Sequence, residues 1–510
     1  LVPSCDDAGI FIYRNDDGQF SLDTAAVFAQ LQGRSKAVYA VDLDNDGDRE
    51  IFVTRIDSSN VLLWNNEGIY TDVSASAGLD DNTYDTFSAC FGDYDRDGFI
   101  DIYVGNRSTI SVVTRNILYR NKGDGTFEEK TYEAGVANFP GATLAVAFVE
   151  VNNDGWPDLY VANDKLTANA LFINNGDGTF TDASEECGAD EEMDGMSVSC
   201  TDFNNDGYLD IYVTNTELMG NKFFVNNQDG TYTESSAELD VQVFKGSWGS
   251  VFVDYDNDGD EDLFVPAMTP AAGNSNVFFI LDDDEFINIS GLLIPESQGP
   301  SMGAAKADYD MDGDYDLVVQ NGQWLAVELL NNGSAPGNYV SVELEGSWSN
   351  REGVGSWIEV FCEGEVYSRY TQLGCNFAGQ DSRRVLFGLG NHTAIDSIRV
   401  QWPSGIVQVE TGLALWQHHL IVESIPSAVV EQDELSSVTI SPNPADDWLR
   451  LKSDEADRST IPLFFSDSAG RKFNGRSESG LVDVSQLAPG LYTMWWLEGQ
   501  LIRSVAFVKR

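Results

Sequence analysis

Side chains that carry oxygen recur in one acidic loop, which the chain repeats six times. Each copy spans nine residues, with oxygen-bearing side chains at positions 1, 3, 5 and 9 and a glycine at position 6. Residues two apart in a tight loop point into the same concavity, and the glycine permits the turn that brings the position 7 carbonyl and the position 9 carboxylate to the same point. This is the ligand pattern of a hard, oxygen-seeking cation. Its sixfold recurrence predicts about six bound calcium ions.

The predicted metal ligands are the side chains at positions 1, 3, 5 and 9 and the carbonyl groups at position 7. For loops 1 to 6 in chain order they are Asp42, Asp44, Asp46, Asp48 and Glu50; Asp93, Asp95, Asp97, Phe99 and Asp101; Glu150, Asn152, Asp154, Trp156 and Asp158; Asp202, Asn204, Asp206, Tyr208 and Asp210; Asp254, Asp256, Asp258, Asp260 and Asp262; Asp308, Asp310, Asp312, Asp314 and Asp316. Asn152 and Asn204 each replace a carboxylate, so we expect loops 3 and 4 to bind most weakly.

The spacing of the loops indicates a repeat architecture. They begin at residues 42, 93, 150, 202, 254 and 308, a period of roughly fifty residues. In each period a small apolar run enters the loop, a β-rich run leaves it, and a further strand leads through an Asn/Gly/Asp turn to an aromatic residue. Four short strands per period predict an all-β fold and the blades of a β-propeller in residues 1–335. A linear β-solenoid is the alternative, although its repeats are usually shorter.

A half-unit at the N-terminus bears on the number of blades. Residues 9–20 (GIFIYRNDDGQF) read as a third and fourth strand without an acidic loop, and the last unit is incomplete near residue 333. Pairing of the two ends would close a ring, which predicts seven blades, with six as the alternative. The units resemble the FG-GAP/VCBS repeats of integrin-α-like propellers over roughly residues 9–333. This resemblance implies a fold and calcium, and no reaction.

The formal net charge of −54 over 510 residues limits the class of partner. A chain of this length exceeds one hydrophobic core, so several domains are expected. We expect no nucleic-acid partner and no anionic membrane surface, because phosphate binding requires a basic face. The excess acid fits solubility in a salty medium, where charges more than about 10 Å apart are screened. The sequence contains no run of about twenty apolar residues, the length needed to span a membrane. The start at Leu1 indicates a processed or trimmed chain.

Six cysteines are present, and their spacing includes no C-x-x-C pair, which argues against a zinc site and against thioredoxin-type chemistry. An even number in an exported, calcium-loaded protein favours disulfides. Sequence proximity favours two pairs and leaves the third by elimination: Cys187–Cys200, Cys362–Cys375 and Cys5–Cys90. Buried free thiols are the alternative.

Residues 336–423 lack the acidic loop and read as strands separated by glycine-rich turns, which predicts a small β-domain. The EGVG turn at 352–355, the FGLG turn at 387–390 and the WPSG tetrapeptide at 402–405 resemble the ASPIC/UnbV module. That resemblance implies an architecture and brings no catalytic role with it.

The polar stretch at 424–437 is a predicted linker. Residues 438–510 carry nine basic and nine acidic residues, so the whole negative charge lies before them. Their short strands and turn residues predict an antiparallel, Ig-like β-sandwich. The PNP motif at 442–444, Asp467 with Gly470, the GLY motif at 490–492 and the basic end resemble the C-terminal sorting domain of the type IX secretion system of Bacteroidota. The resemblance implies that this machinery is a partner and that the protein is secreted or held at the outer cell surface.

Catalytic constellations are scarce. His418 and His419 are neighbours and point to opposite faces of a strand, so they do not form a metal pair, and an acid that holds calcium is not free to act as a general acid. We expect a binding or adhesion module for an extracellular protein or glycan, because ligand sites gather on the loop faces of a propeller. The alternative is a calcium-dependent polysaccharide-degrading enzyme, lyase-like, or its glycan-capture accessory. We expect four tryptophans to pack between blades more than to bind sugars: Trp64, Trp156, Trp248 and Trp324.

Overall fold

The computed structural model describes most of the chain in discontinuous stretches. They are residues 12–16, 19–23, 34–79, 84–109, 112–268, 276–282, 284–290, 300–321, 326–330, 332, 337–377, 379–424, 439–441, 448–452, 461–467, 472–478, 481–485, 487, 489–498 and 501–509. Cys5 of the predicted Cys5–Cys90 pair and Trp324 lie outside these ranges, as does most of the 424–437 linker.

The repeats fold into antiparallel sheets, each of which begins with the strand that enters an acidic loop. Within the described residues there are six such sheets: β3 (Arg34–Val41), β4 (Glu50–Ile56), β5 (Val61–Asn66) and β6 (Ile69–Asp72); β7 (Thr86–Gly92), β8 (Asp101–Asn106), β9 (Ile117–Asn121) and β10 (Phe127–Glu129); β11 (Thr143–Val149), β12 (Asp158–Asn163), β14 (Ala170–Asn174) and β15 (Phe180–Asp182); β17 (Val198–Thr201), β18 (Asp210–Val213), β19 (Lys222–Asn226) and β20 (Tyr232–Glu234); β21 (Val251–Val253), β22 (Asp262–Val265), β23 (Val277–Asp282) and β24 (Glu285–Asn288); β25 (Ser301–Ala307), β26 (Asp316–Asn321) and β27 (Ala326–Leu330). A small extra pair joins β13 (Thr167–Ala168) to β16 (Glu192–Met193).

The first strand of each sheet lies against the first strand of the next. This order runs from β3 through β7, β11, β17 and β21 to β25. Small residues allow the close approach: an ideal Cβ at Gly92 would lie 2.9 Å from the ring of Phe148 in β11. Every side chain of β7 and β11 is buried, which explains why these strands are continuous apolar and small runs rather than alternating ones.

Three one-turn helices follow the fourth strands of the first three sheets: α2 (Ser74–Ala77), α3 (Thr131–Ala134) and α4 (Ser184–Cys187). Each ends at a glycine in the left-handed conformation, for example Gly78 at φ 84°. Glycine adopts this conformation without a steric penalty. With so little helix, the described chain is all-β, as predicted.

The predicted pairing of the two ends is not found among the described residues. The N-terminal strands β1 (Ile12–Asp16) and β2 (Gln19–Asp23) pair with each other, and β25, β26 and β27 form a separate sheet. The hairpin contacts the last repeat instead through loop 6, where Asn15 Nδ2 donates to the carbonyl oxygen of Tyr309 (2.6 Å) and Phe20 packs on the Tyr309 ring. Ring closure and the number of blades therefore stay predictions.

A two-sheet sandwich follows the repeats. Its strands are β28 (Tyr339–Glu345), β29 (Trp357–Cys362), β30 (Glu365–Tyr370), β31 (Val385–Gly388), β32 (Ser397–Gln401), β33 (Val407–Glu410) and β34 (His418–Val422). One sheet has the order β31-β28-β34 and the other β30-β29-β32-β33. Alternate residues of facing strands form the core, including Val342, Val360, Val400 and Trp402. This is the small β-domain expected from the turn pattern.

The connection between β30 and β31 enters the middle of the repeat sheets. We call residues 371–377 and 379–384 the central segment. Leu373 O accepts from Phe91 N in β7 (3.1 Å), Asn376 N donates to Val198 O in β17 (3.0 Å), and Ala40 N in β3 donates to Gln380 Oε1 (2.8 Å). Inner strands of several sheets are thus joined through one segment of the sandwich domain.

The C-terminal region corrects one expectation. Its strands are β35 (Thr439–Ser441), β36 (Trp448–Lys452), β37 (Ile461–Asp467), β38 (Lys472–Glu478), β39 (Leu481–Asp483), β40 (Gly490–Glu498) and β41 (Leu501–Lys509). They form one continuous antiparallel sheet in the order β35-β36-β39-β38-β37-β40-β41, rather than the two sheets of a sandwich. Leu449 in β36 and Phe507 in β41 nevertheless share one core. Because neighbouring strands lie about 4.8 Å apart, the sheet must curl to bring them together.

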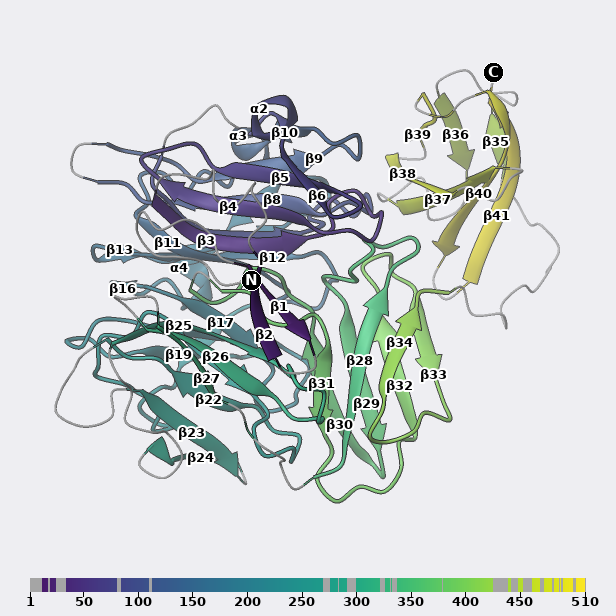
Figure 1. Cartoon of the computed structure of the whole chain (residues 1–510). Helices are drawn as coiled ribbons and strands as arrows, with labels where there is room; N and C mark the ends of the chain where they lie inside the picture. The colour runs from purple at the N-terminus through teal and green to yellow at the C-terminus, as the bar shows by residue number, and fades with distance from the viewer. Residues whose placement is uncertain are drawn as a thin grey trace.

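Figure 1 shows the arrangement of these parts. The repeat sheets stack beside one another, the sandwich lies along one end of them, and the C-terminal sheet is a separate unit. In the part of the chain that the structure describes, no helix has the length and apolar character needed to cross a membrane.

The expected disulfides are wrong for the two pairs that the structure describes. Cys90, Cys187, Cys200, Cys362 and Cys375 are free thiols. Cys362 lies in the sandwich core, whereas Cys375 lies in the central segment. Proximity in sequence therefore did not bring these sulfurs together. The alternative of free thiols holds for all five, of which Cys200 and Cys375 are only partly buried.

Candidate metal centres

The acid at position 9 of each loop is held by two backbone N–H groups. In loop 4, Phe203 N donates to Asp210 Oδ2 (3.3 Å) and Asn226 N donates to Asp210 Oδ1 (2.8 Å). Equivalent donors, one at position 2 and one near the end of the third strand, serve Glu50, Asp101, Asp158, Asp262 and Asp316. All six acids are fully buried. The strands themselves therefore fix the orientation of these carboxylates.

The acid at position 1 closes its own loop in loops 1, 2, 4 and 6. In loop 2, Asp97 N donates to Asp93 Oδ1 and Gly98 N donates to Asp93 Oδ2, both at 2.9 Å; the same pair of bonds serves Asp42, Asp202 and Asp308. A carboxylate has about four acceptor sites, so each oxygen keeps a lone pair for an ion. Loop 5 differs, because Asp254 Oδ2 accepts from Gly388 N of the sandwich (2.8 Å).

Position 4 is a feature that the sequence analysis missed. In every loop this residue has a positive φ: Asn45 (62°), Arg96 (54°), Asn153 (57°), Asn205 (51°), Asn257 (58°) and Met311 (65°). Asparagine adopts this left-handed conformation more readily than most residues. Asparagine at position 4 in four of the six loops was the available signal.

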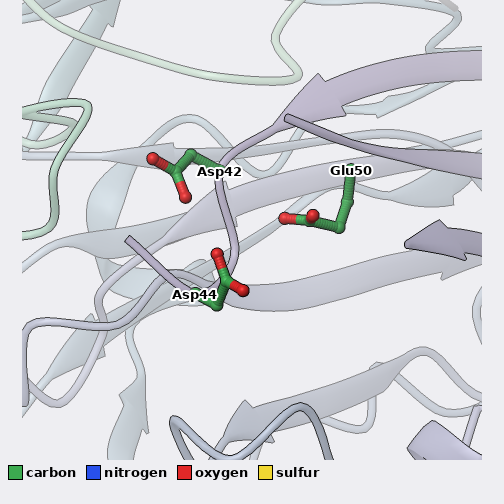
Figure 2. A group of neighbouring side chains, drawn as sticks. All are labelled: Asp42, Asp44 and Glu50. Carbon is green, nitrogen blue, oxygen red and sulfur yellow. The ribbon is translucent and has the colours of Figure 1, made fainter. Parts of the chain in front are cut away.

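Carboxylate oxygens converge in four of the loops. Within the described residues, oxygens lie within 4.8 Å of one another in four groups: Asp42, Asp44 and Glu50; Asp93, Asp95 and Asp101; Asp254, Asp256 and Asp258; Asp308, Asp310 and Asp316. Figure 2 shows the first group, in which the three carboxylates come from the loop and from the start of β4 and surround a common space. Positions 1, 3 and 9 supply three of these groups, and positions 1, 3 and 5 supply the one in loop 5.

The other predicted ligands lie outside these groups. Asp46, Asp97, Asp262 and Asp312 belong to the same loops, and in loop 2 Arg120 draws Asp97 Oδ2 and Asp95 Oδ2 to itself (2.7 Å each). In loops 3 and 4 none of the predicted side-chain ligands, all of which the structure describes, belongs to such a group. They are Glu150, Asn152, Asp154 and Asp158 in loop 3, and Asp202, Asn204, Asp206 and Asp210 in loop 4. There Asn152 Nδ2 donates to Asp154 Oδ2 (3.0 Å) and Asn204 Nδ2 donates to Asp206 Oδ2 (3.1 Å). The position 7 carbonyls of Asp48, Phe99, Trp156, Tyr208, Asp260 and Asp314 stay predicted ligands.

Burial and mutual repulsion disfavour the charged form of these acids. Burial is the main cause that raises the pKa of Asp42 to about 6 and of Glu50 to about 8, and neighbouring carboxylates add to it. Burial likewise raises the pKa of Asp254 to about 8 and of Asp316 to about 7. A bound cation would reverse this balance by compensating the charge.

The residues present fit a hard divalent cation. Carboxylate and carbonyl oxygens are the ligands that calcium prefers, usually six to eight in number. Asp254 is fully buried, yet its Oδ1 has no hydrogen-bond partner among the described residues. A buried carboxylate oxygen without a donor is costly unless a cation faces it. The donor set contains no thiol or imidazole, which argues against zinc and copper.

A second asparagine links neighbouring repeats. At the end of β19, Asn226 Nδ2 donates to Val151 O in loop 3 (3.0 Å) and to Leu209 O of its own loop (3.3 Å). Asn174 makes the same two bonds one repeat earlier, and Asn121 makes them two repeats earlier. In the fifth sheet Leu281 stands at this place, so this link between repeats is absent there. The sequence analysis placed these asparagines in turns without assigning this role.

Aromatic and histidine side chains have structural contacts. Trp64 and Trp248 pack against the core of the first sheets, and Arg96 lies over the Trp156 ring with its guanidinium 4.2 Å from the centroid. His418 Nε2 lies 3.2 Å from Glu343 Oε2, whereas His419 Nε2 lies 2.9 Å from Ala414 O. The two histidines thus face different partners.

The fold and the loops define an all-β repeat protein with acidic, oxygen-lined loops. An FG-GAP-like repeat family model matches residues 2–53, 42–104, 108–161, 150–213 and 202–265, together just over half of the chain. A second family model, ASPIC and UnbV, matches residues 346–428. The chain belongs to the FG-GAP-like repeat family and carries an ASPIC and UnbV domain, which is the sandwich. The resemblances to FG-GAP repeats and to the ASPIC/UnbV module are confirmed. The resemblance of the C-terminal region to a sorting domain stays a prediction.

Curated relatives are similar to most of this chain. Cartilage acidic protein 1 of Homo sapiens is 25% identical over 415 residues, and that of Xenopus tropicalis is 24% identical over 420 residues. Each alignment covers 73% of this chain, which spans only 60% and 62% of those relatives. A solved extracellular domain of a B. thetaiotaomicron one-component system is 10% identical and covers 94% of this chain and 58% of its own, with a TM-score of 0.34, which is too low to define a shared fold.

Proposed function

We propose that the protein is a secreted or cell-surface binding module whose repeat sheets close into a calcium-loaded propeller, with seven blades or, alternatively, six. The observation that carries the calcium assignment is the convergence of carboxylate oxygens at equivalent places in four loops, together with the buried, partnerless Oδ1 of Asp254. Calcium would act as a structural ion that neutralises these acids. Equilibrium dialysis tests the assignment: we expect about six ions, bound at roughly 10⁻⁴–10⁻³ M. A stoichiometry near zero would refute it.

The end of the sheets opposite the acidic loops supports a protein-binding role. Exposed apolar side chains gather in the connections that leave the second and fourth strands: Val112, Phe139, Leu166, Leu218 and Phe244. Exposed apolar side chains that recur in successive repeats are typical of an interaction surface. The ligand is an extracellular protein or a glycan. Pull-down of candidate ligands and a glycan array, each with and without EDTA, distinguish the two.

We propose binding rather than catalysis for this chain. The position 1 and position 9 acids accept hydrogen bonds from backbone N–H groups and face a proposed ion, so they lack the freedom of a general acid. The alternative, a lyase-like enzyme acting on polysaccharides, is tested by incubating the calcium-loaded protein with uronic-acid polysaccharides. Appearance of unsaturated uronate products, detected by their ultraviolet absorbance, would establish the alternative.

The C-terminal sheet is proposed as the sorting domain read by the type IX secretion machinery. Its curled sheet has a core of its own, which includes Leu449, Phe465 and Phe507. A chain that ends at residue 436 should stay in the periplasm of a host with this machinery, and the tail fused to a signal-bearing reporter should carry that reporter out. Normal export of the truncated chain would exclude the assignment.

A further inference from the structure

The sandwich rests on the acidic loops through the two glycine turns that the ASPIC/UnbV pattern contains. At loop 1, Glu352 Oε2 accepts from Asp42 N (3.2 Å) and Glu352 Oε1 accepts from Arg49 Nε (2.6 Å). Arg351 N donates to Asn45 Oδ1 (2.7 Å). The EGVG turn at 352–355 therefore begins on the outer side of loop 1, beside the backbone of the position 1 acid.

The FGLG turn at 387–390 contacts loop 5 more directly than the EGVG turn contacts loop 1, because it bonds to the carboxylate of the position 1 acid. Gly388 N donates to Asp254 Oδ2 (2.8 Å), and Gly390 N donates to Asn257 O (2.8 Å). A Cβ at position 388 would overlap Asp254 Oδ2 and the backbone of Asn257. Only glycine at 388 therefore lets the backbone of the sandwich reach the position 1 acid of loop 5.

This contact takes the place of a bond that other loops make internally. In loops 1, 2, 4 and 6, the glycine at position 6 donates its N–H to the Oδ2 of the position 1 acid. In loop 5 the donor is Gly388 of another domain. Loop 5 is thus completed by the sandwich.

The covered loop holds acceptors that the protein leaves unfilled. Asp254 is 0% exposed and Asn257 is 2% exposed, and the Oδ1 of each has no hydrogen-bond partner among the described residues. Arg369 of β30 reaches the loop and donates from Nη2 to Gly259 O (2.9 Å). Its Nε lies 3.3 Å from Glu261 Oε1, and its charge also partly offsets the burial that raises the pKa of Asp254. One arginine shared between Glu261 and Asp254 does not compensate three convergent aspartates.

We propose that loop 5 and the turn at 387–390 form one composite site for a divalent cation, closed by the sandwich, so that this ion exchanges only when the sandwich lifts from the loop. The proposal rests on the calcium binding proposed above and adds its regulation. Without an ion, seating the sandwich buries three like charges in one place, which opposes docking. With an ion, the unfilled oxygens gain a partner. By linkage, the ion tightens docking by the same factor by which docking tightens the ion.

Calcium release from the full chain tests this proposal. After dialysis establishes the stoichiometry, a fluorescent chelator is mixed with the loaded protein in a stopped-flow instrument. We expect most ions to leave together and about one equivalent to leave at least tenfold more slowly. Gly388→Ala should move that equivalent into the fast phase. The matched control is Gly364→Ala in the same domain, where a Cβ meets nothing within 4 Å although the residue's φ of +102° strains the turn; it should keep the slow phase.

Hydrogen exchange on the unaltered chain gives a second measurement that does not depend on a variant folding. The amides of residues 388 and 390 should exchange at least tenfold faster after chelation, whereas the amides that pair β29 with β32 should keep their protection. Single-phase release, or turn amides that do not respond to chelation, would overturn the composite site. Equal loss in both places would overturn it as well, because the sandwich would then unfold rather than lift. Zero calcium in dialysis would instead refute the proposed function.

Discussion

Loops 3 and 5 have the same nine-residue pattern and very different surroundings. Loop 5 has no exposed residue, because the sandwich covers it and supplies a backbone donor to Asp254. Loop 3 exposes Asn153 and Asp154, and a single arginine of the preceding repeat, Arg96, lies against its glycine. The comparison shows that a metal-loop pattern defines the ligands, whereas the neighbouring domain decides how accessible they are.

Removing calcium should have the largest effect. At ten times its dissociation constant each ion contributes about 1.4 kcal/mol, so six ions contribute on the order of 8 kcal/mol to the free energy of unfolding. Chelation with EDTA should lower the melting temperature sharply, as measured by differential scanning fluorimetry. Limited proteolysis read by mass spectrometry should then cut the more exposed loops 3 and 6 before covered loop 5, and spare the C-terminal sheet. An unchanged melting curve would mean that the loops are ordinary acidic turns.

The pH dependence should differ in sign between the two metal states. Burial raises the pKa of Asp254 to about 8 and of Glu150 to about 7, above their unfolded values, so the calcium-free fold binds more protons than the unfolded chain. The contribution of these two acids to stability is therefore full below about pH 4 and is lost as the pH rises through about 7 to 8. Calcium requires deprotonated ligands, so the stabilisation by calcium should grow over the same window. Melting temperatures in EDTA and in calcium, from pH 4 to 8, check both signs.

Glu261 provides the internal control for this experiment. The positive charges of Arg369 and Lys306 outweigh the effect of burial and lower its pKa to about 2. Its stabilising contribution is lost only as the pH falls through about 2, outside the window. A calcium-free protein that gains stability from pH 4 to 8 would contradict the assignment of the loop acids.

The asparagine links can be compared directly between the fourth and fifth sheets. Asn226→Leu copies the leucine of the fifth sheet and leaves the carbonyls of Val151 and Leu209 without this donor. We expect a loss of roughly 1–3 kcal/mol in unfolding free energy, measured by urea denaturation in calcium. Leu281→Met, which nearly conserves volume, is the matched control at the equivalent place, and we expect it to change stability by less than about 1.5 kcal/mol. Equal effects of the two substitutions would show that the asparagine links contribute nothing to the free energy of unfolding.

Neutralising the position 1 acid of loop 5 should have opposite effects in the two metal states. In calcium, Asp254→Asn should remove about the contribution of one ion, on the order of 1.4 kcal/mol. In EDTA at pH 9 the same change should stabilise the fold, because it removes a buried charge. Asp154→Asn in exposed loop 3 should leave the EDTA value almost unchanged. Melting curves of the unaltered protein and of the two variants measure these effects. An Asp254→Asn protein that is less stable than the unaltered protein in EDTA would contradict the electrostatic account.

The smallest expected effect is an increase in the calcium affinity of loop 3. Asn152→Asp restores the third-position carboxylate of loop 3 and should increase calcium affinity there several-fold, because affinity in such loops follows the number of charged ligands. Calcium titration by isothermal calorimetry measures it. The reverse change in a four-acid loop, Asp95→Asn, should lower affinity, and an Asn152→Asp protein with unaltered affinity would show that charge count does not rank these loops.

Much of the fold could be predicted because its signals are local. The nine-residue loops, the small residues of the inner strands and the turn glycines each act within a few residues. Their recurrence along the chain correctly indicates repeated antiparallel sheets, and the turn glycines indicate a small β-domain. The location of the position 9 acids could also be predicted. The loop pattern places Asp101, for example, at the start of the strand that leaves the loop, which is β8.

Long-range features could not be predicted in this way. Gly388 meets Asp254 across 134 residues, and no local pattern specifies which loop a distant turn covers. The cysteines failed for the same reason: Cys362 and Cys375 are near in sequence, but the chain between them leaves the sandwich core for the central segment. Sequence proximity indicates contact only within one element.

The central segment has a consequence for how the chain folds. Ala40 and Gln380 are hydrogen-bonded although 340 residues separate them. At synthesis rates of about 5–20 residues per second, roughly 20–70 s pass before Gln380 exists to meet Ala40. Contacts of such high order also slow the search once the chain is complete. Until the sandwich domain is synthesised, the inner strands of the first sheets therefore lack their contacts with the central segment and stay accessible to chaperones and proteases.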